Sequence, residues 1–213
     1  MLSKKDQRFD SLAFIYDILV RLVFGKSLKK AQTHYLNKLP DQGKLLILGG
    51  GTGWIVEEIG KRKPALEMVY VEASEKMIAL ARKKSKAVVI DFVHGNEQMI
   101  PEKNSYDAVL TPFFLDLFAP VRLFASMSLI DQALHENGKW FFVDFYVPKE
   151  KGLKKVYAKG LIFVMYRFFR IFCGINARKL PDFDRAFEMA NYELKHEASF
   201  HLGMVVSRIY QKK

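Results

Sequence analysis

The stretch LLILGGGTGW, residues 45–54, decides how this chain folds. Its apolar start predicts a buried strand, and the glycines that follow predict a turn that a ligand can approach at backbone distance. A helix-like stretch over residues 54–62 comes next, and then a second apolar strand over residues 68–71 that ends at Glu72. This order is a βαβ unit, one half of a nucleotide-binding sheet, with a carboxylate at the tip of its second strand, where a ribose diol can donate hydrogen bonds to it.

The spacing of the glycines separates the classes of nucleotide site. A phosphate-binding loop needs Gly-Lys-Ser/Thr at its end, whereas Trp54 and Ile55 follow the last glycine here. A dinucleotide fingerprint needs G-x-G-x-x-G, and neither Gly49 nor Gly51 starts such a pattern. NAD and FAD are therefore disfavoured. The pattern that remains is G-x-G-x-G at Gly49, Gly51 and Gly53.

The rest of the chain alternates strand and helix. Helices are expected over residues 73–82, with Ser74 as N-cap, and over residues 120–135, with Asn137 and Gly138 as a C-cap pair. Further strands are expected over residues 88–93, 106–111 and 139–144. This alternation predicts an α/β fold with a doubly wound parallel sheet.

Ligands of such sheets bind at the carboxyl ends of the strands. Five residues fall at or just past the expected ends of five strands, and these are Gly49, Glu72, Asn96, Thr111 and Asp144. The sequence therefore predicts one crevice at which all five strand ends meet.

These motifs resemble those of the class I S-adenosylmethionine-dependent methyltransferases over nearly the whole chain. The opening RFDSLAFIYD, residues 8–17, narrows the likeness, because its F-D-x-x-A-x-x-Y-D pattern resembles that of ubiquinone/menaquinone-biosynthesis C-methyltransferases. The resemblance implies a Rossmann-like sheet closed by a C-terminal antiparallel hairpin, here expected over residues 193–198 and 204–211 after a helix at 182–191.

The length of 213 residues fits a single domain. We divide it into an N-terminal helical cap (1–40), a cofactor-binding core (41–148), a lid-like aromatic and basic insertion (149–182) and a closing helix with two strands (183–213).

The resemblance implies S-adenosylmethionine as cofactor and assigns roles to single residues. The opening helix would fold over the cofactor, with Tyr16 as a lid contact. The glycine motif would hold the methionine end, Glu72 the ribose hydroxyls and Asn96 the adenine amino group. The full set of expected cofactor-binding residues is Tyr16, Gly49, Gly50, Gly51, Thr52, Gly53, Glu72, Ala73, Met77, Gly95, Asn96, Glu97 and Thr111.

Two positions depart from the family pattern. Asn96 stands where the family commonly has aspartate, and its amide oxygen can still accept a hydrogen bond from an adenine amine. Ile47 stands where the family usually has an acid. Because this change removes a negative charge near a cationic ligand, we expect it to affect cofactor affinity rather than the fold.

Composition limits the partners and the compartment. The single cysteine, Cys173, excludes an internal disulfide and fits a reducing cytoplasm, and the polar N-terminus does not resemble a secretory signal. The five histidines show no ligand spacing, so no metal is expected. The net charge of +11, carried in basic clusters, favours an anionic partner, either a membrane surface or nucleic acid.

The segment over residues 156–173 breaks the α/β rhythm with large apolar and aromatic residues among lysines and arginines. Its longest uncharged stretch, residues 160–166, is far shorter than the ~20 apolar residues of a membrane span. Three interpretations stay open: a helix packed on the edge of the sheet, an aromatic lid over the substrate, or an interfacial helix that contacts anionic lipid.

Methyl transfer mainly requires alignment of donor and acceptor, and an oxygen or carbon acceptor can also need a base. The candidates for such a catalytic base are Asp144, His94, Asp116 and His201, and the expected substrate walls are Phe113, Phe114 and Tyr146. The sequence therefore predicts a methyltransferase for a small, apolar or ring-bearing acceptor. An RNA or DNA methyltransferase and a non-catalytic binding protein of the same fold are the alternatives.

Overall fold

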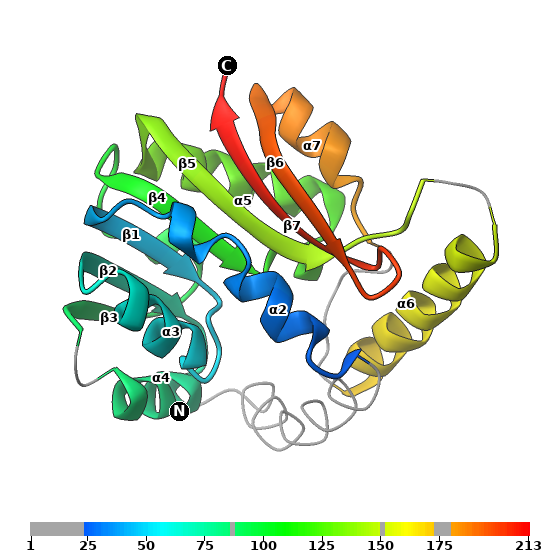
Figure 1. Cartoon of the computed structure of the whole chain (residues 1–213), viewed down its shortest axis with the longest axis horizontal. Helices are drawn as coiled ribbons and strands as arrows, with labels where there is room; N and C mark the ends of the chain where they lie inside the picture. Colours follow the sequence, from blue (N-terminus) through cyan, green and yellow to red (C-terminus); the bar gives the residue numbers. More distant parts are fainter. Residues whose placement is uncertain (1–23, 86–87, 150–151, 173–179) are drawn as a thin grey trace.

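A computed structural model describes residues 24–85, 88–149, 152–172 and 180–213 (Figure 1). Its seven strands form one sheet in the order β3-β2-β1-β4-β5-β7-β6. The strands are β1 (Gln42–Leu48), β2 (Ala65–Glu72), β3 (Ile90–His94), β4 (Tyr106–Pro112), β5 (Leu134–Phe145), β6 (Tyr192–Phe200) and β7 (Val205–Lys212). The first five pair in parallel, whereas β7 pairs antiparallel with both β5 and β6. The predicted parallel sheet with a closing antiparallel hairpin is confirmed.

Helices cover both faces of the sheet. The helices are α2 (Ser27–Thr33), α3 (Trp54–Arg62), α4 (Glu75–Lys84), α5 (Pro120–Ala133), α6 (Leu153–Phe172) and α7 (Phe183–Met189), and the 3-10 turns are η1 (Leu36–Lys38), η2 (Glu97–Met99) and η3 (Leu115–Leu117). Figure 1 shows α2 and α3 on one face, with α5 and α7 on the other. The sheet therefore lies between two helical layers, as a doubly wound fold requires.

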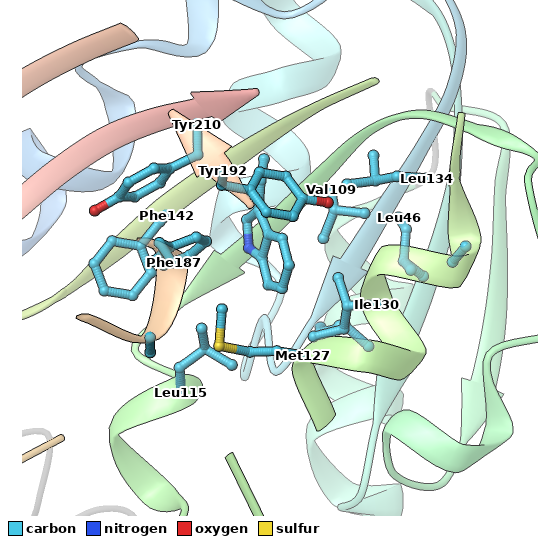
Figure 2. Close-up of a cluster of buried hydrophobic side chains, with 14 of the residues drawn as sticks. Leu46, Val109, Leu115, Met127, Ile130, Leu134, Phe142, Phe187, Tyr192 and Tyr210 are labelled. Atoms are coloured by element: carbon cyan, nitrogen blue, oxygen red, sulfur yellow. The ribbon is translucent and has the colours of Figure 1, made fainter. Parts of the chain in front are cut away.

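Three hydrophobic clusters fill the space between sheet and helices, and two of them share the side chains of β1. Leu46 and Leu48 pack with α5 and α7, whereas Leu45 and Ile47 pack with α3, because successive side chains of a strand point to opposite faces. Figure 2 shows the first cluster, in which Phe187 of α7 lies against Tyr210 of β7. Their rings are stacked with centroids 3.7 Å apart. The position of each strand residue in this alternation decides whether it faces α3 or α5.

The end of α5 differs from the prediction. The helix ends at Ala133, and β5 begins at Leu134, so Asn137 and Gly138 lie in the strand and do not cap a helix. The pairing of β4 with β5 shifts register here, from Leu134 opposite Tyr106 to Lys139 opposite Ala108. A Cβ atom at Gly138 would lie 3.1 Å from the carbonyl oxygen of Tyr106. The glycine therefore serves a close backbone approach at a β-bulge.

Candidate functional site

The glycine loop joins β1 to α3 at the carboxyl end of the parallel strands. Gly49, Gly51 and Gly53 all have positive φ angles, of 71°, 61° and 75°. A Cβ atom at Gly49 would lie 2.8 Å from the Phe114 ring, and one at Gly53 would clash with Ala81 of α4. At Gly51, by contrast, an added Cβ would meet no atom within 4 Å. Two of the glycines thus allow neighbouring elements to approach, and Gly51 leaves backbone open to a ligand.

The carboxylate of Glu72 lies against this loop. Its Oε2 accepts a hydrogen bond from the Gly51 backbone N–H at 3.1 Å, and its Oε1 accepts one from the Ser74 N–H at 3.0 Å. Burial raises the pKa of Glu72, and these two N–H groups partly oppose that shift. Each carboxylate oxygen has a second lone pair, so the group can still accept from a diol. The acid predicted for the ribose is therefore held beside the open part of the loop.

Tyr70 of β2 contacts the glycine loop directly, and this residue was not identified from the sequence. Its hydroxyl donates a hydrogen bond to the Gly51 carbonyl oxygen at 2.7 Å, and its ring lies where a side chain at Gly50 would stand. Thr52, next along the loop, accepts a hydrogen bond from Lys84 Nζ at 3.3 Å. The sequence does contain a signal for this role, because Tyr70 is an aromatic residue in a largely aliphatic strand and lies two residues before the acid.

The ends of β2 and β3 are joined by hydrogen bonds. The Gly95 N–H donates to the Glu72 carbonyl oxygen at 3.0 Å, and His94 Nε2 donates to the Ala73 carbonyl oxygen at 3.0 Å. Asn96 Oδ1 accepts from the Gln98 N–H at 3.0 Å and so begins η2. His94 is thus bound to backbone at the predicted adenine end of the site, away from the tip of β4.

Two further residues of the expected cofactor set are Met77, in the first turn of α4, and Glu97, which contacts α5. The Met77 N–H donates to the Ser74 hydroxyl at 3.3 Å, which confirms Ser74 as the N-cap of α4. Glu97 is buried, and its Oε1 accepts a hydrogen bond from Ser126 of α5 at 2.9 Å. Its Oε2 has no hydrogen-bond partner among the described residues. Glu97 therefore faces α5 and keeps acceptor capacity in a buried position.

Two aromatic residues follow β4, and their rings have different neighbours. Phe113 has a φ angle of 53°, and its N–H donates to the Val143 carbonyl oxygen at 2.7 Å. Its ring lies 5.0 Å from that of Phe145. Phe114 lies against Gly49. Of the two predicted wall residues, Phe114 thus lies at the glycine loop and Phe113 lies beside β5.

Thr111 and Tyr146 serve the core in this structure. Thr111 is fully buried, and its hydroxyl accepts a hydrogen bond from the Trp140 indole N–H at 2.9 Å. The Tyr146 hydroxyl donates to Asp184 of α7 at 2.9 Å, and the Arg208 guanidinium lies over its ring. Both residues were predicted at the site because they end or follow strands, but their side chains face the layer of α5 and α7.

Asp144 and Asp116 form a buried acidic pair below the tip of β4. Asp144 Oδ2 accepts a hydrogen bond from the Asp116 N–H at 3.2 Å, and its Oδ1 accepts from the Phe145 N–H at 2.8 Å. Burial raises the pKa of Asp116 to about 7, and burial together with the charge of Asp116 raises the pKa of Asp144 well above its usual range. The pair thus holds the turn after β4 in position.

Replacing Asp116 by asparagine should make the protein more stable at pH 8 than at pH 5, relative to the wild type. A carboxyl whose pKa is higher in the folded state binds more protons when folded, so its unfavourable contribution grows as the pH rises through about 7. Asparagine removes that charge and keeps the backbone N–H that donates a hydrogen bond to Asp144. We expect the free energy of unfolding in urea to rise by about 2 kcal/mol at pH 8 and little at pH 5.

The exposed Asp91, changed to asparagine, serves as the control for that experiment. An equal effect of Asp116→Asn at both pH values would contradict the assignment of the raised pKa to this pair.

His201 and Tyr16 complete the predicted set. His201 lies in the turn between β6 and β7 with a φ angle of 48°, and its ring centroid is 4.7 Å from that of Phe24. Its Nε2 is buried without a hydrogen-bond partner among the described residues. Because β7 runs antiparallel to β5, this turn lies at the same edge of the sheet as Phe145. Tyr16 lies outside the described residues.

Ile47 lies in the core. It is fully buried in β1 between Tyr70 of β2 and Leu110 of β4, in the cluster that packs beneath α3. An acid at this position would be surrounded by apolar side chains in this chain. The isoleucine therefore matches its surroundings.

Metal sites and membrane-spanning helices are both absent from the described residues. Within the described ranges, no group of three or more His, Cys, Asp or Glu side chains could hold a metal ion. None of the helices in the part of the chain that the structure describes is long and apolar enough to cross a membrane.

Comparisons with known proteins agree with the geometry. A family model described as a methyltransferase domain matches residues 45–138, which include the glycine loop and Glu72. The chain is 32% identical over 156 residues to the demethylmenaquinone methyltransferase of Thermotoga maritima, covering 70% of this chain and 66% of that protein. It is 25% identical over 122 residues to the carboxy-S-adenosyl-L-methionine synthase of Nautilia profundicola, covering 56% and 52%. The chain thus spans about half to two thirds of these relatives.

A solved structure extends the likeness of fold. The 1,6-didemethyltoxoflavin-N1-methyltransferase of Burkholderia thailandensis, a structure with bound S-adenosylhomocysteine, superposes with a TM-score of 0.67 at 12% identity. The alignment covers 100% of this chain and 92% of that one. The whole described architecture is therefore one that methyltransferases use.

Proposed function

Because the chain belongs to the class I S-adenosylmethionine-dependent methyltransferases, we propose that it transfers a methyl group to a small acceptor that is apolar or carries a ring. The contact that carries this proposal is the hydrogen bond between Glu72 and the Gly51 N–H. It places a carboxylate for the ribose beside the one glycine of the motif that faces open space. S-adenosylmethionine is the cofactor of this family, and these residues fit its nucleoside and methionine ends.

The cofactor supplies a methyl group on a sulfonium, which the acceptor displaces in line. The protein has to hold donor and acceptor in that line, and such positioning can supply ~7–11 kcal/mol of the barrier. Phe113 and Phe114 follow the end of β4, with Phe114 against the glycine loop and Phe113 against Phe145, and we assign both to the acceptor side. Their rings favour an apolar or ring-bearing molecule over a charged one.

The relatives support the same class of acceptor. The Thermotoga maritima relative is a demethylmenaquinone methyltransferase by name, so a ring with an apolar substituent is a natural first probe. The nucleic-acid alternative rests on the net charge of +11 and on Lys84, which contacts the loop at Thr52. The non-catalytic alternative rests on Ile47, which stands where the family usually has an acid. Because Ile47 packs in the core beneath α3, packing accounts for this isoleucine without a loss of activity.

One assay separates these alternatives. The protein is incubated with S-adenosylmethionine labelled in its methyl group, and with short-chain demethylmenaquinol, bulk tRNA or sheared DNA in parallel. We expect label in the solvent-extracted quinol and none in the precipitated nucleic acid. Label in RNA or DNA would contradict the proposal, and cofactor binding without transfer to any acceptor would favour a binding protein.

A further inference from the structure

Helix α6 has an unusual distribution of charge. Its 20 residues, LKKVYAKGLIFVMYRFFRIF, contain five lysines and arginines and no acidic residue. Figure 1 shows the helix at the periphery of the fold, beyond the turn between β6 and β7. It follows β5 directly in the chain and belongs to the segment predicted as a lid-like insertion. A helix of this composition presents only positive charge to whatever lies beside it.

The inner side of α6 packs on the domain. Ala158 and Ile162 are buried in a cluster with Phe24, Phe145 and Met204, and Leu161 and Met165 pack against it. Phe113 also packs against this cluster. The helix is therefore anchored to the cluster that contains Phe145 and contacts Phe113, the residue that follows β4.

The opposite side of α6 is apolar and exposed. We define the outer stripe as Leu153, Val156, Tyr157, Phe163 and Val164, whose exposed fractions are 89%, 70%, 49%, 64% and 61%. At 100° per residue these five positions fall on one side of the helix, opposite Ala158 and Ile162. A helix of a soluble domain normally has polar and charged residues on its exposed side, whereas these five exposed positions of α6 are apolar or aromatic.

We propose that the outer stripe of α6 binds the surface of a bilayer that contains anionic lipid, with the helix axis in the plane of the interface. Exposed Lys159 and Arg167 lie on the outward half of the helix, where their ammonium and guanidinium groups can reach lipid phosphates. The net charge of +11 adds long-range attraction to such a surface.

Charge selects this occupant over a second copy of the chain. Two copies of α6 packed stripe to stripe would bring like charges together with no acid on the helix to pair them. An anionic bilayer supplies both an apolar layer for the stripe and negative charge for its basic neighbours. The inference goes beyond the proposed function, because it concerns the outer side of α6 and does not depend on the acceptor.

The test is co-sedimentation of the full chain with vesicles of phosphatidylcholine alone or with 30% phosphatidylglycerol, a proportion of roughly one anionic lipid in three. We expect the wild type to sediment with the anionic vesicles and to be released as salt rises. The variant Val156→Glu/Phe163→Glu should lose at least about tenfold in partition, because it places charge in the stripe. Lys159→Gln/Arg167→Gln should lose about fivefold for each charge removed.

Val121→Glu is the matched control, since Val121 is an 88% exposed residue on α5, away from the stripe. It should bind vesicles as the wild type does, and all variants should keep the wild-type unfolding midpoint and cofactor binding. No sedimentation of the folded wild type would overturn the proposal, and so would equal binding by the stripe variant and the control. A dimer in light scattering that the stripe variant makes monomeric, without vesicle binding, would assign the stripe to self-association instead.

Discussion

Replacing Ile47 by aspartate will lower the free energy of unfolding by about 3 to 5 kcal/mol, because it buries a charge that has no partner. The side chain at this position is fully buried in β1, in the cluster beneath α3 that contains Ile55 and Ile59. The family usually has an acid here, so the substitution restores the family pattern in sequence while it opposes the packing of this chain. Urea unfolding at pH 8 measures the loss.

Ile47→Val is the matched control, with an expected loss of about 1 kcal/mol for one buried methylene. If Ile47→Asp were as stable as Ile47→Val and bound S-adenosylmethionine more tightly than the wild type, our placement of this side chain in the core would be wrong. The site would then have lacked a charge that the cofactor uses.

Replacing Gly51 by alanine will weaken cofactor binding by roughly tenfold to a hundredfold, or about 1.4 to 2.8 kcal/mol. The new methyl group would stand in the open space above the loop, where the backbone has to approach the ligand. The φ angle of 61° also adds backbone strain for any residue with a Cβ atom. Calorimetric titration of the folded variant measures the affinity.

Gly25→Ala separates strain from contact with the ligand. Gly25 has a φ angle of 53° and, like Gly51, nothing within 4 Å of an added Cβ, so both variants carry a similar strain. Gly25→Ala should lower stability by a similar amount and leave the affinity unchanged. Equal losses of affinity in the two variants would show that Gly51 does not lie at the ligand.

Local pattern predicts most of this fold. The apolar runs identify the buried parallel strands because both of their faces are covered, and the glycine spacing identifies the loop because three of its residues need positive φ angles. The pattern fails at Asn137 and Gly138, which look like a helix end. Their role in a β-bulge depends on the pairing of β5 with β4, and local sequence does not contain that pairing.

Local sequence likewise predicts some residues of the candidate site and not others. Residues whose backbone forms the site, such as Gly51 and Gly95, follow from position alone, because all parallel strands end at one edge. Thr111 also ends a strand, but the alternation of side chains turns it toward Trp140 and the layer of α5. Tyr70 was missed because its contact with the Gly51 carbonyl joins a strand to a loop nineteen residues away. The exposed side of α6 could not be predicted either, because it depends on which residues pack against the inner side.

The most direct test is a calorimetric titration of the wild-type protein with S-adenosylmethionine, beside NADH and the variant Glu72→Ala. We predict binding in the micromolar range, no heat with NADH, and roughly tenfold weaker binding by Glu72→Ala, about 1.4 kcal/mol. Glu72 would then be established as the residue that recognises the nucleoside. No binding of S-adenosylmethionine by the folded wild type, or equal binding by Glu72→Ala, would contradict the assignment of this loop and carboxylate as the cofactor site.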